Sequence, residues 1–198
     1  MEFATLLDDL IPRYEVRSRH CIPVAATPAI VYRAARDADL GRPALVRILM
    51  GLRIVPALLW TVLRHSPSPR NRVTSERSVG AAPFTLIAEL PGEEFVLGIM
   101  GRFWTPTGGV VPATAERFRE PPPAGLAQAF WNFRVTASGS GTELSTETRV
   151  RCGDEVTGRK FASYWRIVRP GSSLIRSSML RHIRRVAERH TRSSVAHS

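Results

Sequence analysis

The polar side chains best placed to orient or activate a small molecule lie in one strand-like segment near the end of the chain. Glu147 and Arg149 are two residues apart in the alternating stretch 142–152. Side chains at this spacing share one face of a strand, so the two form either a charge pair on the wet side of a sheet or the polar group of a pocket. The alternation favours the charge pair, and a shift of one residue in strand phase would favour the pocket.

The five histidines do not form a metal or catalytic site. His182 and His190 are eight residues apart, whereas two histidines that bind a metal from one helix face are four apart. His20 lies in a strand-like segment and His65 in a polar loop. The sequence has no HExxH, CxxC, P-loop or nucleophile-elbow motif. It therefore predicts no catalytic residue, no metal site and no cofactor.

Composition predicts one folded domain with a basic end. The chain has 198 residues, 43% of them hydrophobic, and a net charge of +11. Residues 151–198 carry 11 basic and 3 acidic side chains. This charge fits a solvated helix face, peripheral contact with an anionic membrane through Arg181, Arg185 and Arg189, or nucleic acid. Nucleic acid ranks last because aromatic side chains for base stacking are missing after Trp165.

Three features bear on the compartment. Cys21 and Cys152 form no paired motif, and the acidic start of the chain lacks the basic region and apolar run of a signal peptide. Residues 44–63 are long enough to cross a bilayer, but two arginines and a proline interrupt their apolar sequence. We interpret them as a helix that packs against a sheet. We expect a cytoplasmic protein with reduced thiols.

Hydrophobic periodicity predicts the order of elements. A strand over 14–24 precedes a helix that opens at Thr27-Pro28, with Thr as N-cap and Pro at the first helical position. A second helix starts at Pro43. The last strands span 127–137 and 142–152, and a terminal helix capped by Asp154 follows, interrupted at Pro170-Gly171. Between these parts we expect either a short edge strand or an approach to the sheet at 74–79, strands at 84–90 and 95–104, and a further strand within 110–118.

Two segments resemble the START-like, or SRPBCC, superfamily, which includes the birch-pollen allergens and polyketide cyclases. The first runs from Ile22-Pro23-Val24 through TPAIVY to Asp37-Ala38-Asp39, and the second is GTELSTETRV at 141–150, followed by Phe161, Tyr164-Trp165 and Pro170-Gly171. The resemblance covers nearly the whole chain and is to uncharacterised bacterial members. It implies an α+β helix-grip fold, in which a curved antiparallel sheet wraps a long C-terminal helix and two short helices follow the first strand. We expect one domain over 1–192 and a disordered tail over 193–198.

This resemblance implies a cavity between the curved sheet and the terminal helix. We expect it to bind a small hydrophobic molecule, lipid or polyketide-like, and no catalytic pattern of the family carries over. Strand alternation predicts the following lining residues: Phe84, Leu86, Leu97, Ile99, Phe103, Trp131, Phe133, Leu144, Thr146, Phe161 and Trp165.

The same side chains also fit a filled core, which periodicity does not distinguish from a cavity. Two other functions stay open. One is a cyclase or dehydratase that uses polar groups in the same cavity. The other is a surface-binding module that uses the basic C-terminal helix.

Overall fold

The computed structural model describes residues 4–38, 84–105 and 109–195 of the chain. The helix predicted from Pro43 to residue 63 and the edge strand predicted at 74–79 lie outside these ranges. None of the helices within them is long and apolar enough to span a bilayer. In chain order the described elements are α1 (Leu6–Leu10), β1 (Val16–Val24), α2 (Pro28–Arg36), β2 (Thr85–Leu90), β3 (Glu94–Gly101), β4 (Val110–Val111), the 3-10 helix η1 (Glu116–Phe118), β5 (Ala127–Ser138), β6 (Gly141–Cys152) and α4 (Glu155–Val195).

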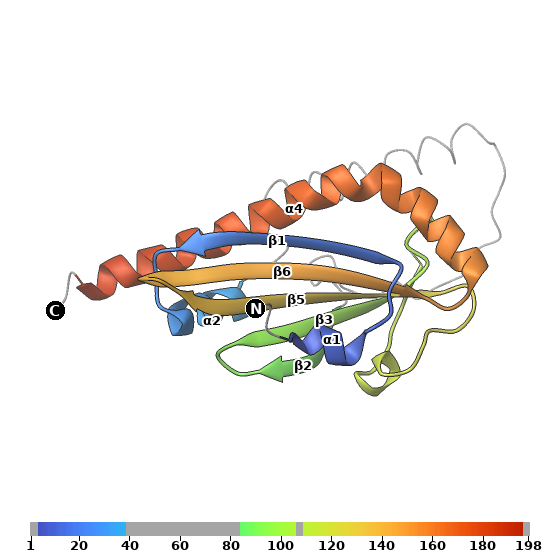
Figure 1. The fold of residues 1–198 in the computed structure, drawn as a ribbon, viewed down its shortest axis with the longest axis horizontal. Helices are drawn as coiled ribbons and strands as arrows, with labels where there is room; N and C mark the ends of the chain where they lie inside the picture. Colours follow the sequence, from blue (N-terminus) through green and yellow to red (C-terminus); the bar gives the residue numbers. More distant parts are fainter. Residues whose placement is uncertain (1–3, 39–83, 106–108, 196–198) are drawn as a thin grey trace, which may run out of the picture.

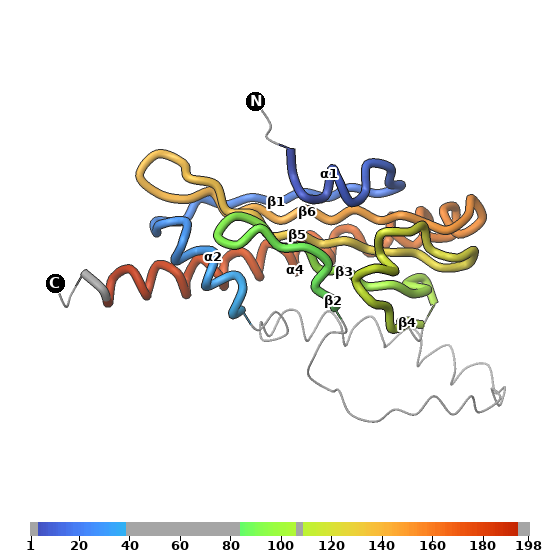
Figure 2. The backbone as a smooth tube through the Cα atoms, turned by 90° about the horizontal axis from the view of Figure 1, so that it is seen from below, coloured from blue at the N-terminus to red at the C-terminus, as the bar shows by residue number. Residues whose placement is uncertain are grey.

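The strands of the described ranges form one six-stranded antiparallel sheet. Its order is β1-β6-β5-β3-β2, with β4 paired to β3. The long strands β1, β6 and β5 curve along their length, and α4 runs along the sheet over β1 and β6 (Figure 1). Figure 2 shows α1 and α2 on opposite sides of the strands. A curved antiparallel sheet with a long C-terminal helix confirms the predicted α+β fold class.

The β5–β6 hairpin is the centre of the sheet and follows directly from the sequence. The inner positions of β5 are apolar and its outer positions are polar except for Phe130, and Ser138 pairs with Gly141 across a two-residue turn. Gly139 in that turn has φ +56°, which glycine adopts without steric cost. In the neighbouring β3, a Cβ at Gly98 would lie 2.2 Å from Ile87 Cδ1 and 2.8 Å from Phe118 Cε1. The absence of a side chain at this glycine therefore leaves room for β2 and η1 to approach β3 closely.

Two predicted strands differ from the structure. The strand expected within 110–118 is only two residues long, and η1 occupies the end of that segment. In β2, the register shifts between Leu86 and Ala88, so the simple alternation predicted over 84–90 is broken. The bulge turns Ile87 into the outer core beside Val96, and Leu86 is left 38% exposed at the sheet edge.

Helix α4 is continuous where the sequence predicts an interruption. It begins after Asp154, whose carboxylate accepts the Thr157 N–H at 2.8 Å, and this confirms the predicted cap. Pro170 lies inside the helix, and the ribbon bends in its N-terminal half (Figure 1). A proline removes one helical hydrogen bond and kinks the helix, and packing on both sides of the kink keeps the turns together. The helix reaches Val195, beyond the domain end predicted at Arg192.

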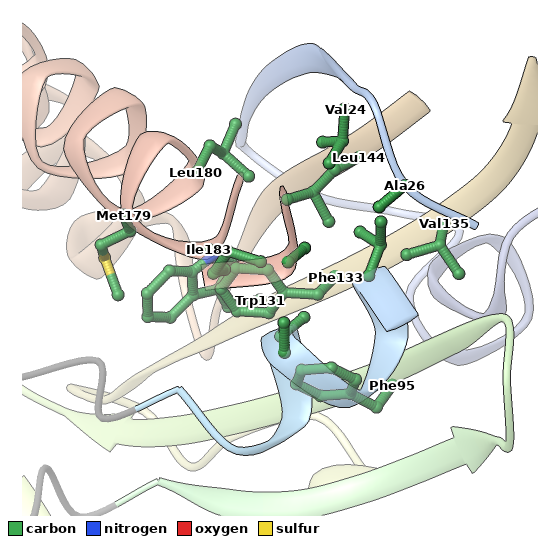
Figure 3. Packing of buried hydrophobic residues seen from close by; sticks show 14 residues of the cluster. Val24, Ala26, Phe95, Trp131, Phe133, Val135, Leu144, Met179, Leu180 and Ile183 are labelled. Carbon is green, nitrogen blue, oxygen red and sulfur yellow. The ribbon is translucent and has the colours of Figure 1, made fainter. Parts of the chain in front are cut away.

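The core lies on both faces of the sheet. On the inner face, side chains of the sheet pack against α2 and α4, and Figure 3 shows Trp131 and Phe133 facing Leu180 and Ile183 of α4. The outer face is covered by α1 and η1. The buried side chains there are Leu7, Ile11, Ile87, Val96, Met100, Phe118 and Phe130. Full burial of one such side chain contributes about 1.5–3 kcal/mol, so both layers stabilise the sheet.

Two glycines give the same substitution opposite effects. A Cβ at Gly153 would lie 2.1 Å from the carbonyl oxygen of Pro123 and 2.6 Å from that of Pro122. Because these obstacles are backbone atoms, we expect Gly153→Ala to lower the free energy of unfolding by about 1–3 kcal/mol. At Gly171, inside α4, a Cβ meets nothing within 4 Å, and Gly171→Ala is expected to raise it by about 0.5–1 kcal/mol. Urea unfolding measures both changes, and a shift of the same sign in the two variants would contradict this packing.

Candidate ligand-binding site between the sheet and helix α4

A strip of polar side chains crosses the middle of the sheet's otherwise apolar inner face. The strand register pairs Ser18 with Thr148, and His20 with Thr146, on the neighbouring strands β1 and β6. We call these four residues the polar strip. The residues next to it on the inner face are apolar: Val16, Val150, Ala129 and Ile99 toward one end, and Ile22, Leu144 and Val135 toward the other.

Three polar side chains at the strip have buried atoms without a hydrogen-bond partner among the described residues. The atoms are Nδ1 of His20, Oγ1 of Thr148, and Nε and Nη1 of Arg176. Arg176 comes from α4, and its guanidinium carbon lies 4.9 Å from the centre of the Trp131 ring. Because about 90% or more of buried polar groups in proteins are hydrogen-bonded, several unpartnered atoms in one place need an explanation.

Arg176 as a whole is half-buried, but its Nε and Nη1 atoms are buried, and its charge has no carboxylate partner in the described part of the chain. Burial lowers the pKa of the Arg176 guanidinium to about 10, so the group is still protonated at neutral pH. Removing an ion from water costs several kcal/mol in a protein. Contact with an aromatic face returns about 2 kcal/mol when the cation is desolvated. The protein therefore keeps this side chain at a net cost to its own stability.

The imidazole of His20 is neutral under the same conditions. Burial lowers the pKa of His20, and the positive charge of Arg176 lowers it further. A neutral imidazole has one nitrogen that donates a hydrogen bond and one that accepts. With the Thr148 hydroxyl, the strip thus offers groups that donate and accept next to a fixed cation.

Trp131 is held in place by hydrogen bonds and by neighbouring rings. Its Nε1–H donates to the Thr146 hydroxyl, which in turn donates to the Asn132 carbonyl oxygen at 2.6 Å. The rings of Phe133 and Phe84 pack against the indole at centroid distances of 4.9 and 5.6 Å. These contacts fix the position of the indole ring against which the guanidinium of Arg176 lies.

The apolar side chains predicted to line the site flank the polar strip at both ends. Near α2 and the second half of α4 lie Phe84, Leu97, Trp131, Phe133 and Leu144. Near the first half of α4 lie Phe103, Phe161 and Trp165. Thr146 belongs to the strip itself, and the register places Ile99 and Leu86 on the inner face of β3 and β2. The structure thus brings these side chains to one face, and their contact with a ligand stays a prediction.

Glu147 and Arg149 lie on the outer face of the sheet, away from α4, so the structure contradicts their predicted role in an inner polar pocket. The two side chains do form a charge pair on the outer face, as the alternation favours, but the pair is buried rather than wet, because they are only 5% and 4% exposed. Arg149 donates to Glu147 at 2.7 Å and to Asp8 at 2.6 Å. It also donates to the carbonyl oxygens of Leu7 and Ile11 at the end of α1. Helix α1 therefore covers the pair and makes it part of the outer core.

Arg176 is the site residue that sequence reasoning misses. It precedes Met179 and Ile183 by three and seven residues, so it shares their buried face of the helix. A charged side chain within an apolar helical stripe is the signal that would reveal it. By contrast, the apolar side chain of Leu174, two residues earlier in the same helix, is 52% exposed.

The exposed face of α4 carries the arginines for which the sequence predicts membrane contact. Arg181, Arg185 and Arg189 are exposed on α4, and each donates from Nε to the carbonyl four residues earlier. Their contact with an anionic membrane stays a prediction.

An open hollow of about 650 Å³ lies between the end of β1, the β5–β6 turn and α4. Within the described ranges, no group of three or more His, Cys, Asp and Glu side chains is placed to hold a metal ion.

Comparisons with known proteins give distant structural likenesses. No protein-family model and no curated protein matches the chain. The crystal structure of TTHA0849 from Thermus thermophilus is 13% identical with a TM-score of 0.35, over 87% of this chain and 97% of that one. The di-domain ARO/CYC StfQ from the steffimycin biosynthetic pathway is 16% identical with a TM-score of 0.40, over 89% of this chain and 51% of that one. The di-domain ARO/CYC BexL from the BE-7585A biosynthetic pathway is 16% identical with a TM-score of 0.38, over 91% of this chain and 53% of that one. This chain therefore spans about half of each di-domain protein, and at these values no family is assigned.

Proposed function

We propose that the protein binds a small, mainly apolar molecule between the inner face of the sheet and helix α4. The observation that carries this proposal is the cluster of buried, unpartnered polar atoms on His20, Thr148 and Arg176 within an apolar layer. Sites for small molecules are mostly apolar and contain a few polar groups that fix orientation. A filled core gives no reason for a cation and two orphaned polar groups at its centre.

The arrangement favours a molecule with an apolar or aromatic body and a few oxygen atoms, such as a lipid or a polyketide-like compound. The body would pack against the flanking aromatic side chains, among them Phe103 and Phe161 at one end and the half-buried Phe84 at the other. Its oxygen atoms would meet the donors of the polar strip. Binding would then satisfy the polar atoms that the described residues leave without partners.

A titration with the neutral fluorophore N-phenyl-1-naphthylamine tests the proposal on the full chain. Ala129 lies on the inner face of the central strand β5, between the polar strip and the Phe161 cluster. Ala129→Trp should occupy the space of the ligand and weaken binding of the fluorophore by about tenfold or more, or 1.4 kcal/mol. Thr136→Trp, at an exposed position of the same strand, adds the same side chain elsewhere and should leave binding unchanged.

Circular dichroism shows whether each variant is folded. Ser18→Trp, on β1 within the polar strip, provides a second way to fill the site if Ala129→Trp does not fold. Binding that is lost in a folded inner-face variant and kept in Thr136→Trp supports the proposal. A wild-type protein that does not bind the fluorophore, or inner-face variants that bind as tightly as the wild type, would overturn it.

A second candidate function is an enzyme of the cyclase or dehydratase kind, and His20 favours it. A neutral, partly buried histidine beside a fixed cation is suited to act as a general base. Denaturing extraction of purified wild type and His20→Asn from the same host separates the two functions. An enzyme predicts that the variant retains a different, unconverted molecule, whereas a binding protein retains the same molecule in both forms.

A further inference from the structure

Arg176 places a positive charge where the described part of the fold supplies no carboxylate in ion-pair contact. Its Nε and Nη1 are buried and have no partner among the described residues. Among the carboxylates of the described strands, Glu143 and Glu147 alternate with the polar strip along β6 and so belong to the outer face. Glu94 accepts from the Leu6 N–H and from Asn132 on that face, and Glu89 of β2 is held by Tyr32 and Arg36 of α2. A charge buried in this way is costly unless another molecule completes its coordination.

The surroundings of Arg176 position the guanidinium for one kind of partner. The indole of Trp131 lies against it at 4.9 Å, and the hydrogen bond from Trp131 to Thr146 fixes that indole. On the strip, the Thr148 hydroxyl can add a third donor atom to the two unpartnered nitrogens of Arg176. A guanidinium with free N–H groups binds an acidic oxygen group more strongly than a neutral carbonyl, because its hydrogen bonds are then charge-assisted on both sides.

We propose that Arg176 binds an acidic group of the ligand, such as a carboxylate, sulfonate, phosphate or ionised phenol on an otherwise apolar body. This inference rests on the proposed function and adds the chemical class of the ligand. The acidic group lies against Arg176 and accepts from Thr148, and the apolar body extends toward one of the flanking aromatic clusters. The ligand thereby neutralises a charge that destabilises the free protein.

A matched pair of fluorophores tests this inference on the full chain. N-phenyl-1-naphthylamine is neutral, and 8-anilino-1-naphthalenesulfonate has the same aromatic skeleton with one sulfonate. Arg176→Gln should weaken the sulfonate by about 10- to 100-fold, the value of a charged hydrogen bond, and change the neutral probe by less than about threefold. Arg176→Lys keeps the charge and should retain most of the sulfonate affinity. Arg185→Gln removes an exposed arginine of the same helix and should affect neither probe.

The outcomes separate this inference from the proposed function. If the neutral probe binds and Ala129→Trp abolishes its binding, but Arg176→Gln leaves the sulfonate unchanged or weakens both probes equally, only the role of Arg176 is wrong. If Arg185→Gln weakens the sulfonate as much as Arg176→Gln, the probe binds the helix surface and the inference also fails. If neither probe responds to Ala129→Trp, the proposed function fails together with this inference.

If Arg176→Gln does not fold, Arg176→Met removes the charge at similar volume. The melting temperature of Arg176→Met without ligand should equal or exceed that of the wild type.

Discussion

Replacing Arg149 by alanine is expected to lower the free energy of unfolding by about 3–5 kcal/mol, the cost of breaking a buried ion pair from one side. The Arg149 side chain is 4% exposed and bonds Glu147 at 2.7 Å and Asp8 at 2.6 Å. Without Arg149, the ion-pair partner that Glu147 keeps in the described part of the chain is Arg17. Arg17 is 41% exposed, whereas Glu147 is only 5% exposed. Helix α1 also loses the donor to its last carbonyl groups. Urea unfolding measures the loss.

Arg19→Ala is the matched control on the same face of the sheet. Arg19 and Glu143 lie 3.6 Å apart, and both are more than 40% exposed, so their pair should contribute less than about 1 kcal/mol. If Arg149→Ala costs no more than Arg19→Ala, the buried network does not anchor α1.

Acid should weaken the same network. Partial burial of Asp8 raises its pKa, but hydrogen bonds from the Thr5 N–H and from Arg149 outweigh this effect and lower the pKa to about 2. Because the pKa in the folded protein is below the ordinary 3.8, this contribution to stability is present above about pH 4. It is lost as the pH falls toward 2.

Phe133→Ala is expected to cost about 3–5 kcal/mol, because it removes an aromatic ring from the centre of the inner cluster. Phe133 is 1% exposed, and its ring packs against Phe95 at 5.2 Å and Trp131 at 4.9 Å between centroids. The neighbouring rings belong to a sheet and cannot collapse into the space that the alanine leaves. Thermal or urea unfolding of the ligand-free protein measures the effect.

The stability of Phe133→Ala also shows whether Phe133 belongs to the packed core or lines the ligand site. Leu174→Ala, at a position of α4 that is 52% exposed, is the control and should change the free energy of unfolding by less than about 0.5 kcal/mol. A loss of 3 kcal/mol or more at Phe133 would identify it as core beside the site. A loss as small as that of Leu174→Ala would mean that Phe133 lines open space, and the inner cluster would not be packed as described.

The fold is more predictable from this sequence than the site. The β5–β6 hairpin has a two-residue periodicity, a small-residue turn and a capped helix after it, and these local signals agree with one another. Pro170 misleads, because the rule that proline interrupts a helix ignores the packing that holds both halves of α4. The bulge at Leu86 is likewise set by contacts between strands rather than by the alternation of one strand.

The site depends on which face each residue occupies and on what covers that face. The charges of Glu147 and Arg149 indicate a wet surface only as long as α1 is not known to lie over them. Arg176 is hidden by the opposite effect, because one charge among many arginines at a basic end looks like solvated surface. Its spacing to Met179 and Ile183 contains the necessary information, but only the sheet beneath α4 shows that this helix face is buried.

The most direct test of the central claim is native mass spectrometry of the full chain with equimolar N-phenyl-1-naphthylamine. We expect one fluorophore bound per chain in the wild type and in Thr136→Trp, and none in Ala129→Trp. The same adducts in all three proteins, or no adduct in the wild type, would contradict binding between the sheet and α4 and would favour a filled core.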